Sequence, residues 1–254
     1  MMKKSQISFF IIAGILIFIA FSFLTYLNDL ELEKTQTEPK NIYFELAPVK
    51  NFIESCLREK SLEALEFVGS KGGYYNDPDF GVDYLYRKVP YYYYLGNDVM
   101  PTIRFVEESI SDYIEDGISS CINDFVAFPG LEIIGGDANV NTILNENKVS
   151  FNLNYPIAVK KGNQSTANLE DFAIELPVRF IDLYAAGAQI TELQIEDSDN
   201  ICLSCLADTA IENNVSINLE NYDKETILFK VTLNTTLQDY EIIQLIFANK
   251  YLIK

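Results

Sequence analysis

The sequence predicts an α+β fold, in which an N-terminal transmembrane helix precedes an exterior domain with an antiparallel sheet and several packed helices. Three patterns support this. Residues 9–27 carry no charge, residues 49–68 and 106–125 place apolar side chains at helical spacing, and residues 149–159 and 172–178 alternate between apolar and other side chains. Paired strands with helices grouped between them are typical of the α+β class.

The segment from Phe9 to Leu27 has the length of a membrane span. At a rise of 1.5 Å per residue it covers about 29 Å, roughly the thickness of the hydrocarbon layer. A cleaved secretory signal has a shorter apolar core of about 7–15 residues and a small-x-small cleavage site, and none follows Phe23. Lys3 and Lys4 precede the span and acidic residues follow it, so we expect a retained single-pass anchor in the cell membrane, with the N-terminus cytoplasmic and the C-terminal domain outside.

The rest of the chain divides by composition. The expected segments are a basic leader at 1–8, the span at 9–27, a stalk at 28–45 that Pro39 interrupts, and an exterior domain at 46–254 with a subdivision considered near residue 130. In the exterior domain, the first helical stripe runs from Val49 to Val68 and ends at Gly69, Gly72 and Gly73. A second helix starts at Pro101. The segment between the helices has the character of a hairpin or an irregular ribbon.

From Leu131 onward the apolar period changes to that of strands. Residues 149–159 form a half-buried strand, which we expect near a sheet edge because Pro156 cannot donate a ladder hydrogen bond. The following strand, at 171–178, suits an antiparallel pairing with it. Further along the chain the patterns predict helices at about 179–196 and 202–212, an antiparallel strand pair at 215–219 and 227–233, and a final strand within 240–253.

Composition restricts the kinds of function. The formal net charge is −18, and residues 28–254 hold 17 of the 19 cationic and all 37 acidic residues, which gives −20. A field of that sign repels phosphate backbones, so we expect no nucleic-acid partner. The chain has no His, which excludes Ser-His-Asp and Cys-His nucleophiles and His-containing zinc sites. We expect no cofactor, no metal site and no catalysis.

The N-terminal residues Lys3-Lys4-Ser5-Gln6-Ile7-Ser8, followed by an apolar helix, resemble the class III signal of archaeal type IV pilin-like proteins. In that family a short basic leader is clipped, and the resemblance implies a cut between Ser5 and Gln6. Ser5 stands where the family has Gly, and Phe10 stands where it has Glu. The whole chain is also similar to uncharacterised archaeal membrane-anchored proteins of this length, a resemblance that implies no activity.

Four cysteines suit an oxidising compartment. Cys56 and Cys121 lie on the apolar stripes of two helices, so we expect them to form a disulfide if these helices pack together; buried free thiols are the alternative. Cys202 and Cys205 are separated by two residues at a helix start, where backbone N–H groups lower a thiol pKa. A local structural disulfide is the first interpretation of this pair. A thiol–disulfide exchange site, or half of a metal site with Cys56 and Cys121, is the alternative.

Aromatic and asparagine motifs supply the other candidate sites. Eight of the sixteen tyrosines lie between Tyr74 and Tyr94, and we take Tyr91, Tyr92, Tyr93 and Tyr94 as candidates for binding a glycan or protein ligand, with packing in a sheet as the alternative. Among three Asn-x-Ser/Thr triplets, Asn163 and Asn214 are the candidates for glycosylation.

These patterns indicate a membrane-anchored surface protein whose acidic exterior domain has a binding or structural role, with a pilin-like version as its closest variant. The partners expected are the membrane, through a single span, and a surface protein or glycan. A membrane-tethered thiol–disulfide oxidoreductase using Cys202 and Cys205 is the main alternative. A carboxylate-based hydrolase of surface glycans is a third hypothesis, although no acid pair stands out.

Overall fold

The computed structural model describes residues 40–162, 166–234 and 243–252. The predicted leader, the predicted span at 9–27 and the candidate Asn163 lie outside this part of the chain. None of the helices within the described ranges is long and apolar enough to cross a membrane. The chain divides into two units, Met1–Ala47 and Pro48–Lys254, and the fold below is that of the second.

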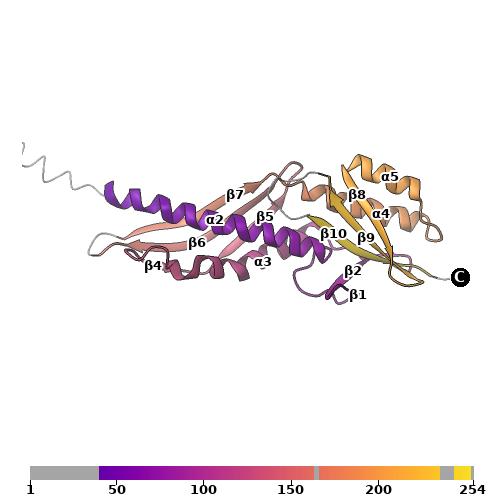
Figure 1. The fold of residues 1–254 in the computed structure, drawn as a ribbon, viewed down its shortest axis with the longest axis horizontal. Helices are drawn as coiled ribbons and strands as arrows, with labels where there is room; N and C mark the ends of the chain where they lie inside the picture. Colours follow the sequence, from indigo (N-terminus) through magenta and orange to yellow (C-terminus); the bar gives the residue numbers. More distant parts are fainter. Residues whose placement is uncertain (1–39, 163–165, 235–242, 253–254) are drawn as a thin grey trace, which may run out of the picture. The chain divides into compact units, whose positions relative to one another are not determined.

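The described residues form an α+β domain, as predicted (Figure 1). Its helices are α2 (Lys40–Ser70), α3 (Ile103–Ile122), α4 (Phe180–Glu196) and α5 (Leu203–Glu212), with a short 3₁₀ turn at Asn123–Phe125. Its strands are β1 (Gly81–Tyr84), β2 (Arg87–Tyr94), β3 (Asn97–Asp98), β4 (Glu132–Gly135), β5 (Asn139–Leu144), β6 (Val149–Lys160), β7 (Ala167–Leu176), β8 (Val215–Asn221), β9 (Thr226–Leu233) and β10 (Gln244–Lys250).

The first sheet has the order β1-β2-β10-β9-β8, and β3 pairs with β2. Strands β8, β9 and β10 pair antiparallel, as the sequence predicts for the first two. In contrast, β10 runs parallel to β2 and places Ala248 opposite Tyr91. This sheet is therefore mixed, whereas the sequence predicts antiparallel pairing. The parallel pairing joins segments about 150 residues apart, which no local pattern specifies.

The second sheet is antiparallel throughout. Strand β6 is its centre, with β7 along one side and β4 and β5 sharing the other. The prediction that Pro156 places this strand near an edge is wrong. Pro156 lies instead where the β6–β7 register shifts, between Asn154 and Ile157, and its carbonyl accepts a hydrogen bond from the N–H of Gly136. A bulge is the other position in a sheet at which proline is tolerated.

Alternation along these strands separates a buried face from a solvated one. The buried residues of β5, β6 and β7 are Val140, Thr142, Leu144, Val149, Phe151, Leu153, Ile157, Val159, Phe172, Ile174 and Leu176. Asn152, Asn154 and Asp171 lie between them and are exposed. This alternation of buried apolar and exposed polar residues is typical of an antiparallel sheet with one face in solvent. Strands β4 and β5, which the sequence analysis does not predict, complete this sheet.

Helices α2 and α3 lie along the second sheet, and α4 packs on the first sheet with α5 beside it (Figure 1). The predicted stripe on α2 is buried, with Val49, Ile53, Leu57 and Leu65 all at 0% exposure. Gly72 and Gly73 follow α2 with φ of +58° and +88°, the left-handed geometry that favours glycine after a helix. At α3, Thr102 is the N-cap, and its hydroxyl accepts from the N–H of Phe105 at 3.3 Å.

Candidate functional site

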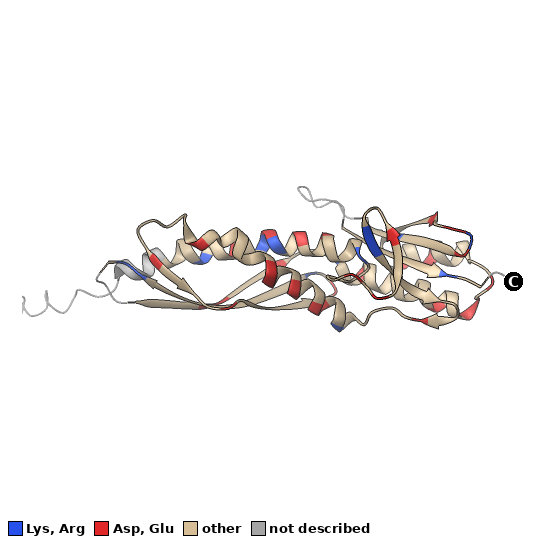
Figure 2. Cartoon of the chain, turned by 90° about the horizontal axis from the view of Figure 1, so that it is seen from below, with Lys and Arg blue, Asp and Glu red and all other residues tan. Residues whose placement is uncertain are grey.

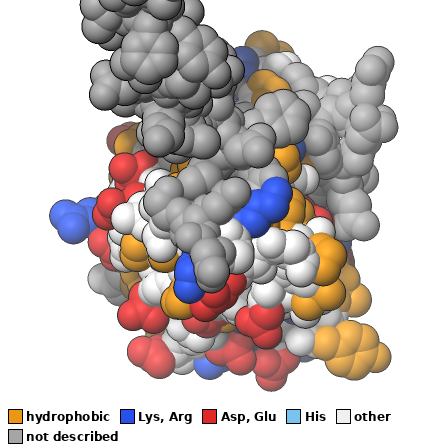
Figure 3. Space-filling model, turned by 90° about the vertical axis from the view of Figure 1, so that its left-hand side faces the viewer, with side chains coloured by type: hydrophobic (Ala, Val, Ile, Leu, Met, Phe, Trp, Pro, Cys, Tyr) orange, Lys and Arg blue, Asp and Glu red, His pale blue; other side chains and the backbone are white. Residues whose placement is uncertain are grey.

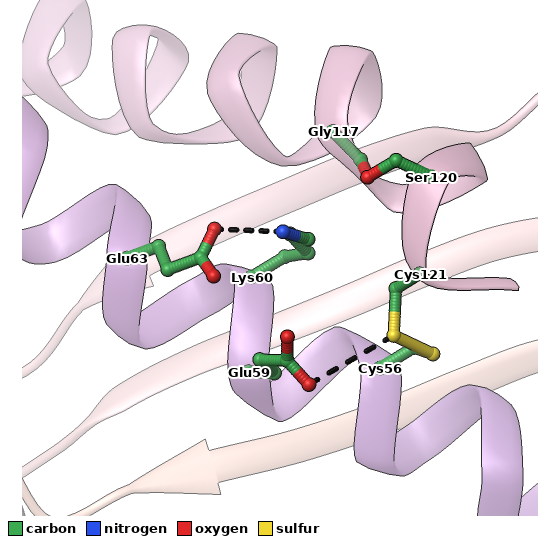
Figure 4. Close-up of a disulfide and its surroundings, with 7 residues drawn as sticks. All are labelled: Cys56, Glu59, Lys60, Glu63, Gly117, Ser120 and Cys121. Atoms are coloured by element: carbon green, nitrogen blue, oxygen red, sulfur yellow. Dashed lines mark hydrogen bonds and ion pairs between the residues drawn. A yellow bond between two sulfur atoms is a disulfide. The ribbon is translucent and has the colours of Figure 1, made fainter.

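The disulfide Cys56–Cys121 joins α2 to α3 (Figure 4), which confirms the predicted pairing. The two Cα atoms are 5.7 Å apart, within the usual range for a disulfide. Beside it on α2, the ammonium of Lys60 lies 2.8 Å from the carboxylate of Glu63, and this hydrogen bond raises the pKa of Lys60. The two cysteines are 65 residues apart in the sequence, so the disulfide restrains the segment between them, which includes β1, β2, β3 and most of α3.

The tyrosine run of β2 is a packing element. The ring of Tyr92 is fully buried and stacks on Phe247 with 4.2 Å between centroids, while its hydroxyl donates to the carbonyl of Gly72 at 3.1 Å. Burial raises the pKa of Tyr92 well above its ordinary value. Tyr93, on the same strand, is 2% exposed and packs beside Tyr251.

Burial corrects the expectation that these four tyrosines present their rings to a partner. Tyr91 is also buried, and it contacts Phe80 and Tyr94. Only Tyr94 is half-buried, so it is the one member of the run with surface to offer a ligand. The physical reason is that β2 is an interior strand, with neighbours in the sheet on both sides and α4 against it.

Cys202 and Cys205 form the predicted local disulfide at the start of α5. Cys202 is the N-cap of this helix, and its sulfur accepts a hydrogen bond from the N–H of Cys205 at 3.2 Å. Both residues are partly exposed. The same backbone N–H is positioned to stabilise negative charge on that sulfur if the bond is reduced.

Cys205 also lines a pocket of about 290 Å³ between α4 and α5. The pocket is acidic, because carboxylates come from both helices: Glu192, Glu196, Asp208 and Glu212. Leu193 supplies an apolar side chain between them. No ion pair within the described ranges involves any of these four carboxylates. The two carboxylates on each helix are four residues apart and therefore on one helix face, and all four line the gap between the helices.

A row of α3 side chains caps the outer edge of β5, an arrangement that the sequence did not reveal. The N–H groups of Val140, Thr142 and Leu144 donate to Glu115, Ser111 and Glu107 at 2.6, 3.1 and 2.9 Å. Four helical residues rise about 6.0 Å and two strand residues about 6.8 Å, so the two spacings match over this length. Acidic residues recur along this helix (Figure 2), and two of them protect a strand edge that would otherwise be open to pairing.

The sequence-predicted glycosylation site Asn214 is accessible. It is exposed, and it has a φ of +52° in the turn between α5 and β8. The hydroxyl of Ser216, the third residue of this triplet, donates to the side-chain carbonyl of Asn234 at 2.6 Å. Glycosylation at Asn163 and Asn214 stays a prediction.

Carboxylates are spread over the surface visible from one end of the molecule (Figure 3), in keeping with the acidic composition. Within the described part of the chain, no group of three or more His, Cys, Asp or Glu residues could hold a metal ion. Comparison of the chain with protein-family models, with curated proteins and with solved structures finds no match.

Proposed function

We propose that the chain is a single-span membrane-anchored surface protein whose acidic exterior domain has a binding or structural role and no catalytic one. The observation that carries the proposal is the uncharged segment 9–27, with Lys3 and Lys4 before it and acidic residues after it. Two disulfides that use all four cysteines support an oxidising location for the domain, because such bonds are rare in reducing compartments.

The pilin-like variant of this proposal concerns the leader. Its support is the resemblance of residues 3–8 to a class III signal, which places the cut between Ser5 and Gln6. A chain clipped there keeps the whole apolar segment and therefore stays in the membrane. The mature N-terminus separates the two variants, because the clipped chain starts at Gln6 and the unclipped chain at Met1 or Met2.

Fractionation of cells that make the full chain tests the anchor. We expect the chain in the membrane fraction after a carbonate wash. A protease added to cells whose outer envelope has been removed, with the cell membrane intact, should digest residues 48–254. A matched variant with Ile15→Lys and Ile19→Lys should lose the membrane fraction, since each charge at a helix centre costs about 3 kcal/mol. Recovery of the unaltered chain in the cytosol with reduced thiols would contradict the proposal. Mass spectrometry of the same sample identifies the N-terminus.

One observation favours a second candidate, a thiol–disulfide oxidoreductase: the N–H of Cys205 donates to the sulfur of Cys202. In that reaction a thiolate of a partner dithiol protein attacks the Cys202–Cys205 bond and forms a mixed disulfide. The second partner thiol then breaks the mixed disulfide, so the partner is oxidised and the pair leaves as two thiols. The acidic groups of the adjoining pocket oppose thiolate formation, which places this candidate second.

Equilibration in graded glutathione buffers, followed by alkylation and mass spectrometry, distinguishes the two candidates. We expect Cys202–Cys205 to stay oxidised down to about −300 mV, as structural disulfides do. Half-reduction between about −270 and −120 mV, the range of exchange enzymes, would instead favour the oxidoreductase. Cys56–Cys121, which is part of the helix packing, is the internal reference in the same spectra.

A further inference from the structure

The turn that joins β1 to β2 has an unusual sequence for its geometry. Tyr84 pairs with Arg87, so Leu85 and Tyr86 alone make the connection. Their φ angles are +46° and +64°, both left-handed. Two-residue hairpins of this kind favour Asn-Gly or Asp-Gly, because a side chain with a Cβ is unfavourable at positive φ. Strained residues of this type cluster at functional sites.

Both side chains of this turn project into solvent. Leu85 is 69% exposed, and the side chain of Tyr86 is fully exposed. Neither side chain makes a hydrogen bond, an ion pair or a ring contact with the part of the chain that the structure describes. The fold thus gains no packing from these two side chains in a conformation that disfavours them, and both are free for a contact with another molecule.

The turn is also locally basic in an acidic chain. Arg87 and Lys88 follow it directly, and no ion pair among the described residues includes either. Lys88 donates to the carbonyl of Asp79 and lies opposite Asp83 in the hairpin register. Arg87 donates to the hydroxyl of Ser70 and lies over the ring of Phe67. We call residues 85–88 the hairpin tip. Its combination of Tyr, Leu and two cations suits a partner that is both acidic and partly apolar.

The pocket between α4 and α5 has the complementary chemistry. Glu192, Glu196, Asp208 and Glu212 surround Leu193 and the disulfide sulfur of Cys205. A second acidic hollow lies between α3 and β5, but most of its carboxylates have partners: Glu107 and Glu115 accept from β5, and Glu108 pairs with Arg104, which leaves Asp112. In the α4–α5 pocket, Glu212 accepts a hydrogen bond from the amide of Gln189, and none of the four carboxylates forms an ion pair within the described ranges, so this pocket has the larger share of charge open to a cation.

The tip does not face this pocket within one chain. Tyr84, beside the tip, packs with Tyr91 and Leu228 on one face of the first sheet. Helix α4 packs on the other face, where Gly187 lies against Tyr92. We propose that the hairpin tip of one copy docks into the α4–α5 pocket of a second copy, with Tyr86 in the pocket and Lys88 among its carboxylates. Different surfaces meet in this contact, so in a pair of copies one keeps a free pocket and the other a free tip, and assembly continues head to tail. The inference rests on the proposed structural role and supplies its partner.

Photo-cross-linking tests the contact with the full chain in detergent micelles. A photoreactive phenylalanine at position 86 should link to peptides from residues 189–212 of another copy, at a yield that rises with protein concentration. Tyr86→Ser should weaken self-association at least tenfold in sedimentation experiments, since buried interface tyrosines are common hot spots. The control is Ile134→Ser, which removes an exposed apolar side chain from β4 of the second sheet and should change nothing.

Charge reversal makes the test specific. Lys88→Glu should weaken association, and combining it with Glu192→Lys and Glu196→Lys should restore it. Links from position 86 to lipid or detergent alone would overturn the proposal in favour of a membrane contact. Unchanged association of Tyr86→Ser would overturn it as well. A Tyr86→Ser chain that no longer associates but stays in the membrane fraction supports the contact. If the unaltered chain is absent from the membrane fraction, only the proposed membrane anchor is overturned.

Discussion

Replacing both Cys56 and Cys121 with serine is expected to lower the free energy of unfolding of the domain by about 4 kcal/mol. The reason is the length of the loop that the bond closes, which is 65 residues of sequence. Without the bond, the unfolded chain gains the conformational freedom of that loop. Urea unfolding of the full chain in detergent, followed by tyrosine fluorescence, measures the change as a shift in midpoint at constant slope.

The second disulfide is a matched control within the same protein. Cys202 and Cys205 are only three residues apart, and the same relation gives about 1.6 kcal/mol for so short a loop. The Cys202→Ser, Cys205→Ser chain should therefore lose well under half as much stability. Equal losses in the two variants would contradict the loop-closure argument and indicate instead that α5 depends on its cap.

Replacement of Tyr92 by alanine is expected to cost about 3–5 kcal/mol, the range for removing a large buried aromatic ring. Tyr92 is at the centre of the first sheet, stacked on Phe247, which in turn stacks on Phe229 at 5.3 Å. Removal of the ring leaves a cavity beside β10, the strand whose parallel pairing with β2 closes the sheet. The free energy of unfolding is again the quantity to measure.

Two further substitutions separate the parts of this effect. Tyr92→Phe keeps the ring and removes the hydrogen bond to the carbonyl of Gly72, which should cost about 1 kcal/mol. Tyr86→Ala removes an exposed tyrosine and should change stability by less than about 0.5 kcal/mol. A large loss at Tyr86 with a small loss at Tyr92 would show that the tyrosine run of β2 does not form the core.

The tyrosine-rich region therefore contains two different kinds of residue. Tyr92 and Tyr93 have no surface and act by packing, whereas Tyr86 has no packing within the described chain and full exposure. Composition alone suggested one recognition patch at Tyr91–Tyr94. The structure places the candidate contact a few residues earlier, in the turn. The signal that could have found it is the two-residue gap between the strands, filled by Leu-Tyr where Asn-Gly is the usual choice.

The edge of β5 shows a similar limit. Glu107 and Glu115 look like members of a solvated helix face, because their positions fit that pattern as well as any other. Their carboxylates in fact accept from the backbone of a strand more than twenty residues later. A strand of six residues with weak apolar content, such as Asn139–Leu144, is hard to recognise from its own sequence, and its cap cannot be recognised before the strand itself is known.

The sequence by itself determined the local elements of this protein: the stripes of α2 and α3, the alternation of β6 and β7, and the β8–β9 pair. For the cysteines it favoured the two observed disulfides but left their connectivity open. These features depend on periodicity within a few turns or a few strand residues, and on cysteines placed along those stripes. Only the tertiary structure decided that β10 runs parallel to β2, that β6 is central despite Pro156, and that Tyr92 is buried while Tyr86 is not. Such outcomes depend on which distant segments meet. A strand's neighbours in the sheet, and not its own residues, determine whether it lies at an edge and which of its faces is buried.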